Sequence, residues 1–198
     1  MIPLWFKIAY TLFVCFLVLI YWRRYGPTNF LWFSDIALLV TMPALWLESP
    51  LLASMMALAV ILPELAWNVD FFARLTTGAS LMGLSGYMFD RSIPLFIRAL
   101  SLFHVGLPLF LVWMLYRLGY DKRAFLAQTL VAAIVLPLSY LFGDPQRNVN
   151  WVYGFGERPQ TRVPALWFLA FLILMFPLVI YLPTHLVLDK VFGSASSD

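Results

Sequence analysis

Charged side chains are scarce in this chain of 198 residues. They make up 12% of the sequence, against roughly 25% in a typical soluble domain. Hydrophobic residues make up 63%, and the mean hydropathy is +0.86. These polar side chains are too few to cover a globule in water. A soluble fold is therefore excluded, and a protein solvated by lipid is indicated. The basic residues form no patch, so we expect membrane lipids as partners and no nucleic acid.

Cysteine occurs once, as Cys15 within an apolar run. An intramolecular disulfide is therefore excluded, and we interpret the thiol as buried and unreactive. The sequence also lacks His-x-x-x-His and Glu-x-x-His spacing, a phosphate-binding Gly-x-x-x-x-Gly-Lys loop, and a lysine deep in an apolar run. We therefore expect no metal and no cofactor, and the sequence does not indicate a metalloprotease, a nucleotide-binding protein or a retinal protein.

Long apolar runs, separated by short polar turns, are abundant. Each is about 17 to 24 residues long, the length of a helix that crosses a hydrocarbon layer of about 30 Å. We predict an all-α, multi-pass membrane bundle of about seven transmembrane helices, in a single domain over residues 1–192. The predicted spans are 4–22, 30–47, 51–67, 71–89, 93–116, 124–142 and 164–186. The fourth is the weakest, and a re-entrant path stays open for it.

Two polar segments lie outside these spans. Residues 143–163 form the only long polar segment, and its Trp151 and Tyr153 predict that part of it lies on the membrane interface. The tail at 193–198, rich in serine, is expected to be disordered. Arg23 and Arg24 close the first span where a signal peptide would have small residues, so we expect that helix to be uncleaved.

Basic residues in the short connections indicate the orientation. Arg23, Arg24 and the basic loop 117–123 would lie on one side of a seven-span bundle. The positive-inside rule assigns that side to the cytoplasm, which puts the N-terminus outside and the C-terminus inside. We expect an inner or plasma membrane of bacterial type.

Polar residues within the apolar runs are the candidate site, because a carboxylate at the centre of a membrane helix costs about 2.5–3.5 kcal/mol and is rarely kept without a partner or water. The substrate-binding candidates are Asp35, Glu64, Asn68, Arg74, Gln128 and His104. Glu64 and Asn68 are four residues apart and share a helix face. We expect Asp35, Glu64, Arg74 and Gln128 to converge near the cytoplasmic side. For His104, near mid-membrane, a hydrogen bond to a neighbouring helix and a proton-relay role both stay open.

The start of the predicted fourth span suggests local pairing. Asp70 is placed to cap that helix and to pair with Arg74, one turn later. Ala79 and Gly83 would form a small face for close helix packing. Five prolines, each about 14 residues into its span, predict kinks; they are Pro43, Pro63, Pro108, Pro137 and Pro177.

Three functions fit these features. An inward-facing acidic cluster without a nucleophile or metal motif favours a small-solute or proton-linked transporter. A membrane enzyme acting on a lipid or isoprenoid is the first alternative. Glu64 or Asp35 would be the base, and a headgroup phosphate would be held by Arg74 or by Arg147, Arg158 and Arg162 of the polar segment. A non-catalytic subunit or assembly factor of a membrane complex is the second, with residues 143–163 as a docking surface for other membrane subunits. The sequence leaves open whether the protein is an enzyme.

Overall fold

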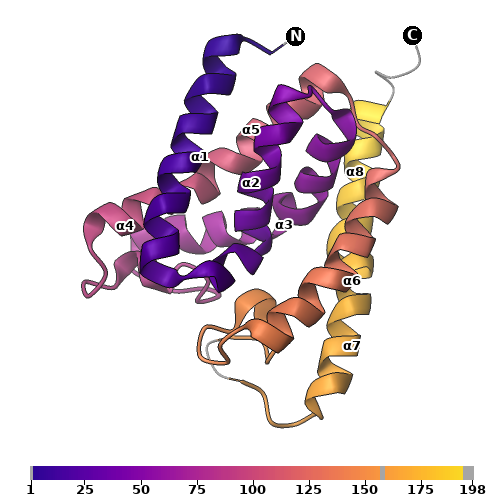
Figure 1. Ribbon diagram of the computed structural model, residues 1–198. Helices are drawn as coiled ribbons and strands as arrows, with labels where there is room; N and C mark the ends of the chain where they lie inside the picture. The colour runs from indigo at the N-terminus through magenta and orange to yellow at the C-terminus, as the bar shows by residue number, and fades with distance from the viewer. Residues whose placement is uncertain (1, 157–158, 194–198) are drawn as a thin grey trace.

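The computed structural model describes residues 2–156 and 159–193, and this part of the chain is helical without a strand. The predicted all-α fold is therefore confirmed for the described residues. The predicted tail lies outside them, apart from Gly193. The elements are α1 (Leu4–Tyr25), η1 (Pro27–Leu31), α2 (Phe33–Trp46), α3 (Pro50–Thr77), η2 (Gly86–Phe89), α4 (Leu95–Leu100), α5 (Phe103–Leu118), α6 (Ala124–Phe142), η3 (Val149–Trp151), α7 (Ala165–Met175), the π-helical η4 (Phe176–Tyr181) and α8 (Leu182–Phe192) (Figure 1).

Five helical stretches of the described chain are long and apolar enough to cross a membrane. They are Leu4–Tyr25, Pro50–Thr77, Leu95–Leu118, Ala124–Phe142 and Ala165–Phe192. A sixth helix, α2, has 14 residues, or about 21 Å at 1.5 Å per residue, and η1 precedes it. The protein is thus an integral membrane protein by the length and apolar character of its helices, and the count of seven spans is not confirmed.

The predicted fourth span, 71–89, is not a helix of its own. α3 runs on for 28 residues and ends at Gly78, whose positive φ of 77° closes the helix in a left-handed cap. Residues 78–85 are non-helical and wrap around the carboxylate of Asp70, which lies inside α3. The predicted cap of a new helix at Asp70 and the small packing face at Ala79 and Gly83 are therefore wrong, because both required a helix over this segment.

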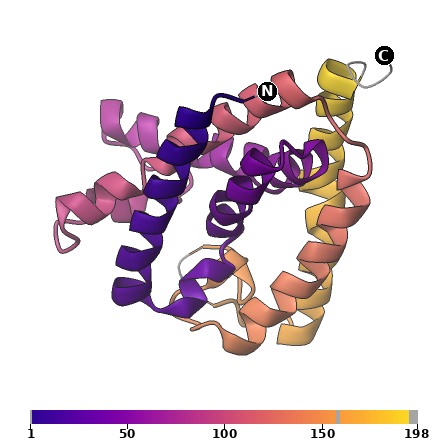
Figure 2. The ribbon, with the colours of Figure 1, turned by 45° about the horizontal axis from the view of Figure 1, so that its top comes forward.

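The two ends of the described chain lie at the same end of the bundle (Figures 1 and 2). Ile2 N donates to Glu48 Oε1 at the α2–α3 turn (3.0 Å), and Tyr120 N in the α5–α6 loop donates to the Phe192 carbonyl (3.3 Å). Asp121 N donates to Ser54 Oγ near the start of α3 (2.9 Å), which ties these loops together. We call this the terminal end. The predicted opposite placement of the termini depended on a separate span at 71–89, which the structure lacks.

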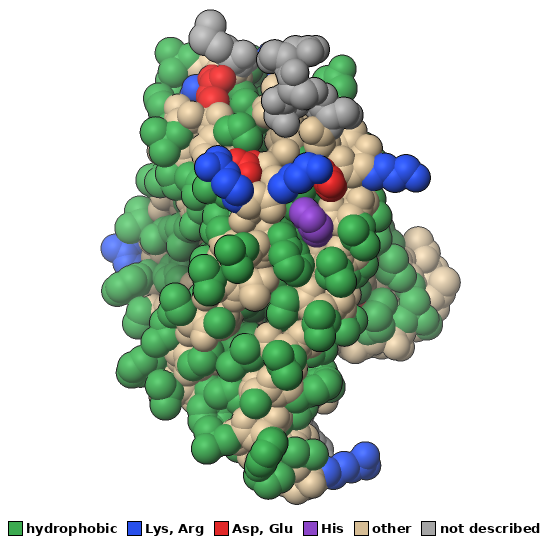
Figure 3. All heavy atoms as spheres, turned by 90° about the vertical axis from the view of Figure 1, so that its right-hand side faces the viewer, with side chains coloured by type: hydrophobic (Ala, Val, Ile, Leu, Met, Phe, Trp, Pro, Cys, Tyr) green, Lys and Arg blue, Asp and Glu red, His purple; other side chains and the backbone are tan. Residues whose placement is uncertain are grey.

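The core lies around α3, which packs against α2, α5 and α6. Buried Ala53, Ala57 and Ala59 let the neighbouring helices approach α3 closely. On the outside, large apolar side chains are exposed along most helices, and Figure 3 shows one face covered mainly by hydrophobic side chains, with most charged ones near the top. Such a band suits contact with lipid tails. Cys15 of α1 is among the exposed residues, so the predicted burial of its thiol is wrong.

Four of the five prolines lie inside α2, α3, α5 and α6, as the sequence predicts, while Pro177 lies in the π-helical turn. A π-helical turn leaves the regular hydrogen-bond pattern and recurs at functional sites.

The segment 143–163 folds back on the bundle in its described part. Val149, Asn150 and Val152 are buried. Asn150 Oδ1 accepts the Phe33 N–H at the start of α2 (3.1 Å), and its amide donates to the Leu31 carbonyl (2.7 Å). This amide fixes the first turn of α2, the turn that carries Asp35.

Candidate functional site: a buried carboxylate–imidazole pair

Glu64 of α3 and His104 of α5 meet inside the bundle. His104 Nδ1 lies 2.8 Å from both carboxylate oxygens of Glu64, and the two side chains are 15% and 4% exposed. In lipid an isolated carboxylate is costly, and a hydrogen-bonded imidazole removes much of that cost. The bond joins two helices 40 residues apart in the chain. His104 therefore makes a hydrogen bond to a neighbouring helix, which is one of the two roles that the sequence left open for it.

Asn68 donates hydrogen bonds to the backbone of both Glu64 and His104. Its Nδ2 donates to the Glu64 carbonyl (2.7 Å) and to the His104 carbonyl (2.8 Å). Because residues four apart share a helix face, Asn68 lies on the side of α3 that carries Glu64. The amide therefore cross-links α3 and α5 next to the pair.

Aromatic rings enclose the imidazole. Trp67 stacks on His104 with ring centroids 4.8 Å apart, and Phe103 with centroids 4.1 Å apart. These rings restrict the imidazole and exclude bulk water around it. Low local polarity strengthens the remaining hydrogen bond.

Asp35 contributes a second buried carboxylate from α2. Asn29 Nδ2 donates to Oδ2 (3.1 Å), while Oδ1 has no hydrogen-bond partner among the described residues. Asp35 interacts electrostatically with His104 and Glu64, so the two predicted acids lie in one region of the bundle. An unpartnered buried carboxylate oxygen is rare and can accept a proton or a donor group.

Three hydroxyl groups border this region, and no sequence pattern predicted them. Tyr21 of α1 shares a hydrogen bond of 2.9 Å with Ser101, three residues before His104. Tyr87 of η2 lies against Trp67, with ring centroids 6.4 Å apart, and within electrostatic range of Tyr21 and Glu64. Tyrosine and serine are common in membrane helices, so only the packing of α1, α5 and η2 singles these residues out.

Arg74 and Gln128 lie apart from the pair, against the predicted four-residue convergence. Arg74 stacks over the Phe89 ring, with its guanidinium carbon 4.9 Å from the ring centroid, and forms no ion pair with Asp70 in the described part of the chain. Gln128 of α6 donates weakly to the Tyr181 hydroxyl (3.4 Å), and its Oε1 is buried without a described partner. Sequence spacing could place each residue on its own helix but could not predict which helix faces meet.

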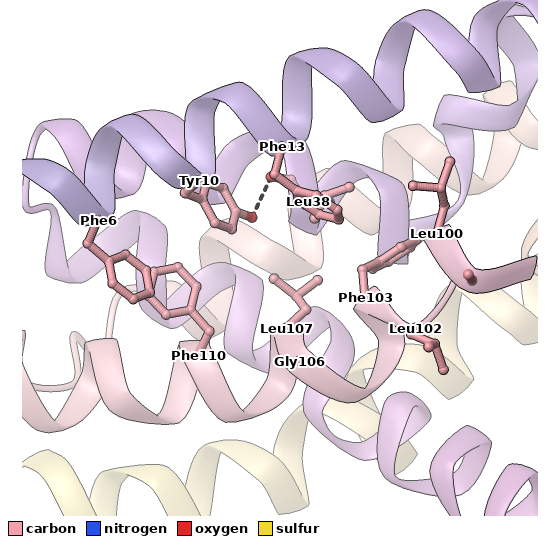
Figure 4. Close-up of a pocket in the computed structure, with 11 residues that line it drawn as sticks. Phe6, Tyr10, Phe13, Leu38, Leu100, Leu102, Phe103, Gly106, Leu107 and Phe110 are labelled. Carbon is pink, nitrogen blue, oxygen red and sulfur yellow. Dashed lines mark hydrogen bonds between the residues drawn. The ribbon is translucent and has the colours of Figure 1, made fainter. Parts of the chain in front are cut away.

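An apolar groove runs between α1 and α5 (Figure 4). Its volume is about 390 Å³, and its wall includes Phe6, Phe103, Leu107 and Phe110. The only hydroxyl there is that of Tyr10, which donates to the Leu38 carbonyl (2.8 Å). Phe103, the residue before His104, lines the groove. The groove itself presents no free polar group.

No family model matches the chain, and neither a curated protein nor a solved structure is detectably similar to it. Functional inference therefore depends on the geometry of the site itself. Among the described residues, no group of three His, Cys, Asp or Glu side chains is placed to hold a metal ion.

Proposed function

We propose that the protein is a small proton-linked carrier in which Glu64, His104 and Asp35 hold the proton inside the membrane. The observation that supports this most is the buried hydrogen bond between the Glu64 carboxylate and His104 Nδ1. Ionisable pairs of this kind, inside a bundle of apolar helices, occur in proton pathways.

The charge balance follows from the three groups. If Asp35 holds no proton and the Glu64–His104 pair holds one proton beyond the N–H of the neutral imidazole, the three groups together carry a single negative charge. One further proton makes them neutral, so proton uptake lowers the electrostatic cost of the site in lipid. In a carrier, this change in charge would favour one of two arrangements of the helices that meet at the pair.

The test is proton flux across liposome membranes. Purified protein is reconstituted with pyranine inside, and a potassium diffusion potential is set with valinomycin. We expect Glu64→Gln and His104→Gln to lower the initial rate of acidification by about tenfold or more, because each removes a proton-transfer group.

Asp189→Asn is the matched control, since Asp189 is a membrane-helix acid paired with Lys122 at 3.1 Å, at the terminal end. It should keep the wild-type rate. Equal rates in wild type, both site variants and protein-free liposomes would contradict the proposal.

The groove between α1 and α5 favours one second candidate, an enzyme that acts on a lipid or isoprenoid. An apolar chain in the groove would lie beside Phe103, with His104 as the adjacent base. Lipid mass spectrometry of cells that lack the protein would test it: an accumulating lipid, restored to normal by wild type and not by His104→Gln, is the expected result. Against this candidate, the groove exposes no polar group to a substrate.

We further propose that the terminal end faces away from the cytoplasm. Among the described residues, five basic side chains belong to the terminal end and seven to the opposite end or the segment after α3. The five are Lys7, Arg117, Lys122, Arg123 and Lys190; the seven are Arg23, Arg24, Arg74, Arg91, Arg98, Arg147 and Arg162. The positive-inside rule then assigns the second set to the cytoplasm, with both termini outside.

A further inference from the structure

A polar pocket lies where α3 ends, away from the Glu64–His104 pair. Its volume is about 460 Å³, and it is lined by Arg74, Gly83, Gly86, Tyr87 and Asp90. The Phe89 ring supports the Arg74 guanidinium from one side at 4.9 Å. A planar guanidinium held over a ring presents its edge donors in a fixed direction, the geometry that recognises phosphate.

Arg74 has no carboxylate partner within ion-pair distance among the described residues. The nearby Asp70 carboxylate is already fully engaged, because four backbone N–H groups and the Ser85 hydroxyl donate to it. Asp90 also lines the pocket, but its carboxylate accepts the Ser92 N–H (2.8 Å), and that bond, with the charge of Arg98, holds its pKa below the usual range. None of these bonds involves Arg74, so its guanidinium is without an ion pair among the described residues, while Asp90 keeps its negative charge on the same wall.

Exposed apolar side chains flank the lining residues along the chain. Leu75 follows Arg74 in the last turn of α3, and Leu81 and Met82 precede Gly83 in the loop. A free phosphate ion gains nothing from apolar neighbours, whereas a phospholipid would bury its glycerol and upper tail carbons against them. The segment after α3 lies beside the bundle in both ribbon views (Figures 1 and 2).

We propose that this pocket binds the phosphate of an anionic glycerophospholipid, with Arg74 as the phosphate ligand and the side chains of Leu75, Leu81 and Met82 as the tail contact. Tyr87, Asp90, Gly83 and Gly86 line the remaining wall. Gly86 keeps the pocket open on one side, because a Cβ there would lie 3.5 Å from Arg74 Nη1. The site does not depend on the proton-linked function.

The test is native mass spectrometry of the full chain in detergent, titrated with dioleoylphosphatidylglycerol. We expect Arg74→Gln to weaken lipid binding about tenfold, since a charge-assisted contact to phosphate is lost. Arg74→Lys should bind between the two, because it keeps the charge but not the planar fork. Arg24→Gln, an exposed arginine at the end of α1, is the matched control and should bind as wild type does.

Two competition arms distinguish the sources of phosphate. Inorganic phosphate and glycerophosphoglycerol, which lacks tails, should not displace the lipid at equal concentration. Displacement by either would show a simple anion site and overturn the lipid assignment. Unchanged binding in Arg74→Gln would overturn the proposal, and if that variant does not fold, the same conclusion is drawn from Phe89→Leu, which removes the ring that orients the guanidinium.

Discussion

Glu64 and His104 illustrate how a membrane helix keeps ionisable side chains. Each would be costly alone in the bundle interior, and each supplies the hydrogen bond that the other needs at 2.8 Å. Asn68 and the rings of Trp67 and Phe103 fix their positions. Removing one partner leaves the other buried without its bond, so the two residues should act as a unit in stability as well as in function.

A double-mutant cycle tests this coupling. We expect Glu64→Gln and His104→Phe each to lower the free energy of unfolding by about 2–4 kcal/mol, and the double variant to lower it by clearly less than their sum. The coupling energy should be about 1–3 kcal/mol. Unfolding in mixed micelles with increasing dodecyl sulfate would measure it, and additive losses would show that the two side chains do not interact.

Sequence reasoning named Asp35, Glu64, Asn68 and His104 as candidates because they are rare polar residues in apolar runs, but it did not predict that Glu64 pairs with His104. It also assigned Arg74 and Gln128 to the same site, and the structure separates them. Depth along a helix can be predicted from position in a span, but the facing direction depends on packing between helices. For Arg74 the depth was misjudged as well, because the helix that carries it begins 24 residues earlier at Pro50.

At the scale of the element, Asp70 determines how the chain leaves α3. Its Oδ1 accepts the N–H groups of Leu81, Met82 and Gly83, and its Oδ2 accepts the N–H and the hydroxyl of Ser85. These donors belong to a non-helical loop that would otherwise leave them unpaired. A single carboxylate thus replaces the hydrogen bonds that a helix would have supplied to residues 81–85.

Asp70→Asn should loosen this loop without breaking the bundle. An amide accepts through one oxygen and has no charge, so we expect local stability to fall by about 2–3 kcal/mol. Hydrogen–deuterium exchange should be faster at residues 81–85 and unchanged in α5 and α6. Asp90→Asn, whose carboxylate holds the Ser92 N–H, is the control. Unaltered exchange at 81–85 in Asp70→Asn would show that the loop is held by other contacts.

The wrong prediction of a helix over 71–89 has a physical explanation. Hydropathy and length alone admit a span there, but Gly78 and Gly83 both adopt positive φ, which a continuous helix does not allow. The frequent glycines, accompanied by serine, were the available signal, because both residues have a lower helix propensity than alanine or leucine. The other predicted spans overlap helices of the described chain, although 30–47 covers η1 and the short α2, and 93–116 covers both α4 and α5.

For the whole molecule, the absence of a separate helix over 71–89 changes which connecting loops lie on the same side of the membrane. The turn after α2 and the loop between α5 and α6 meet at the terminal end, through Ser54 and Asp121. In a seven-span bundle those two connections would lie on opposite sides of the membrane. The Lys7–Glu48 pair at 2.8 Å adds the start of α1 to the same end. Any proton path to Glu64 and His104 therefore runs through a bundle in which both ends of the described chain lie on the same side of the membrane.

Cysteine labelling on intact cells separates the two topologies. In a Cys15→Ser background, Leu47→Cys and Lys122→Cys should react alike with a membrane-impermeant maleimide, because both positions are exposed at the terminal end. Gln146→Cys, in the α6–α7 connection, should show the opposite behaviour. With the termini outside, the first two label before lysis and the third only after it. If Leu47→Cys and Gln146→Cys instead label together and Lys122→Cys does not, seven spans are correct, and the shared side of the termini is wrong.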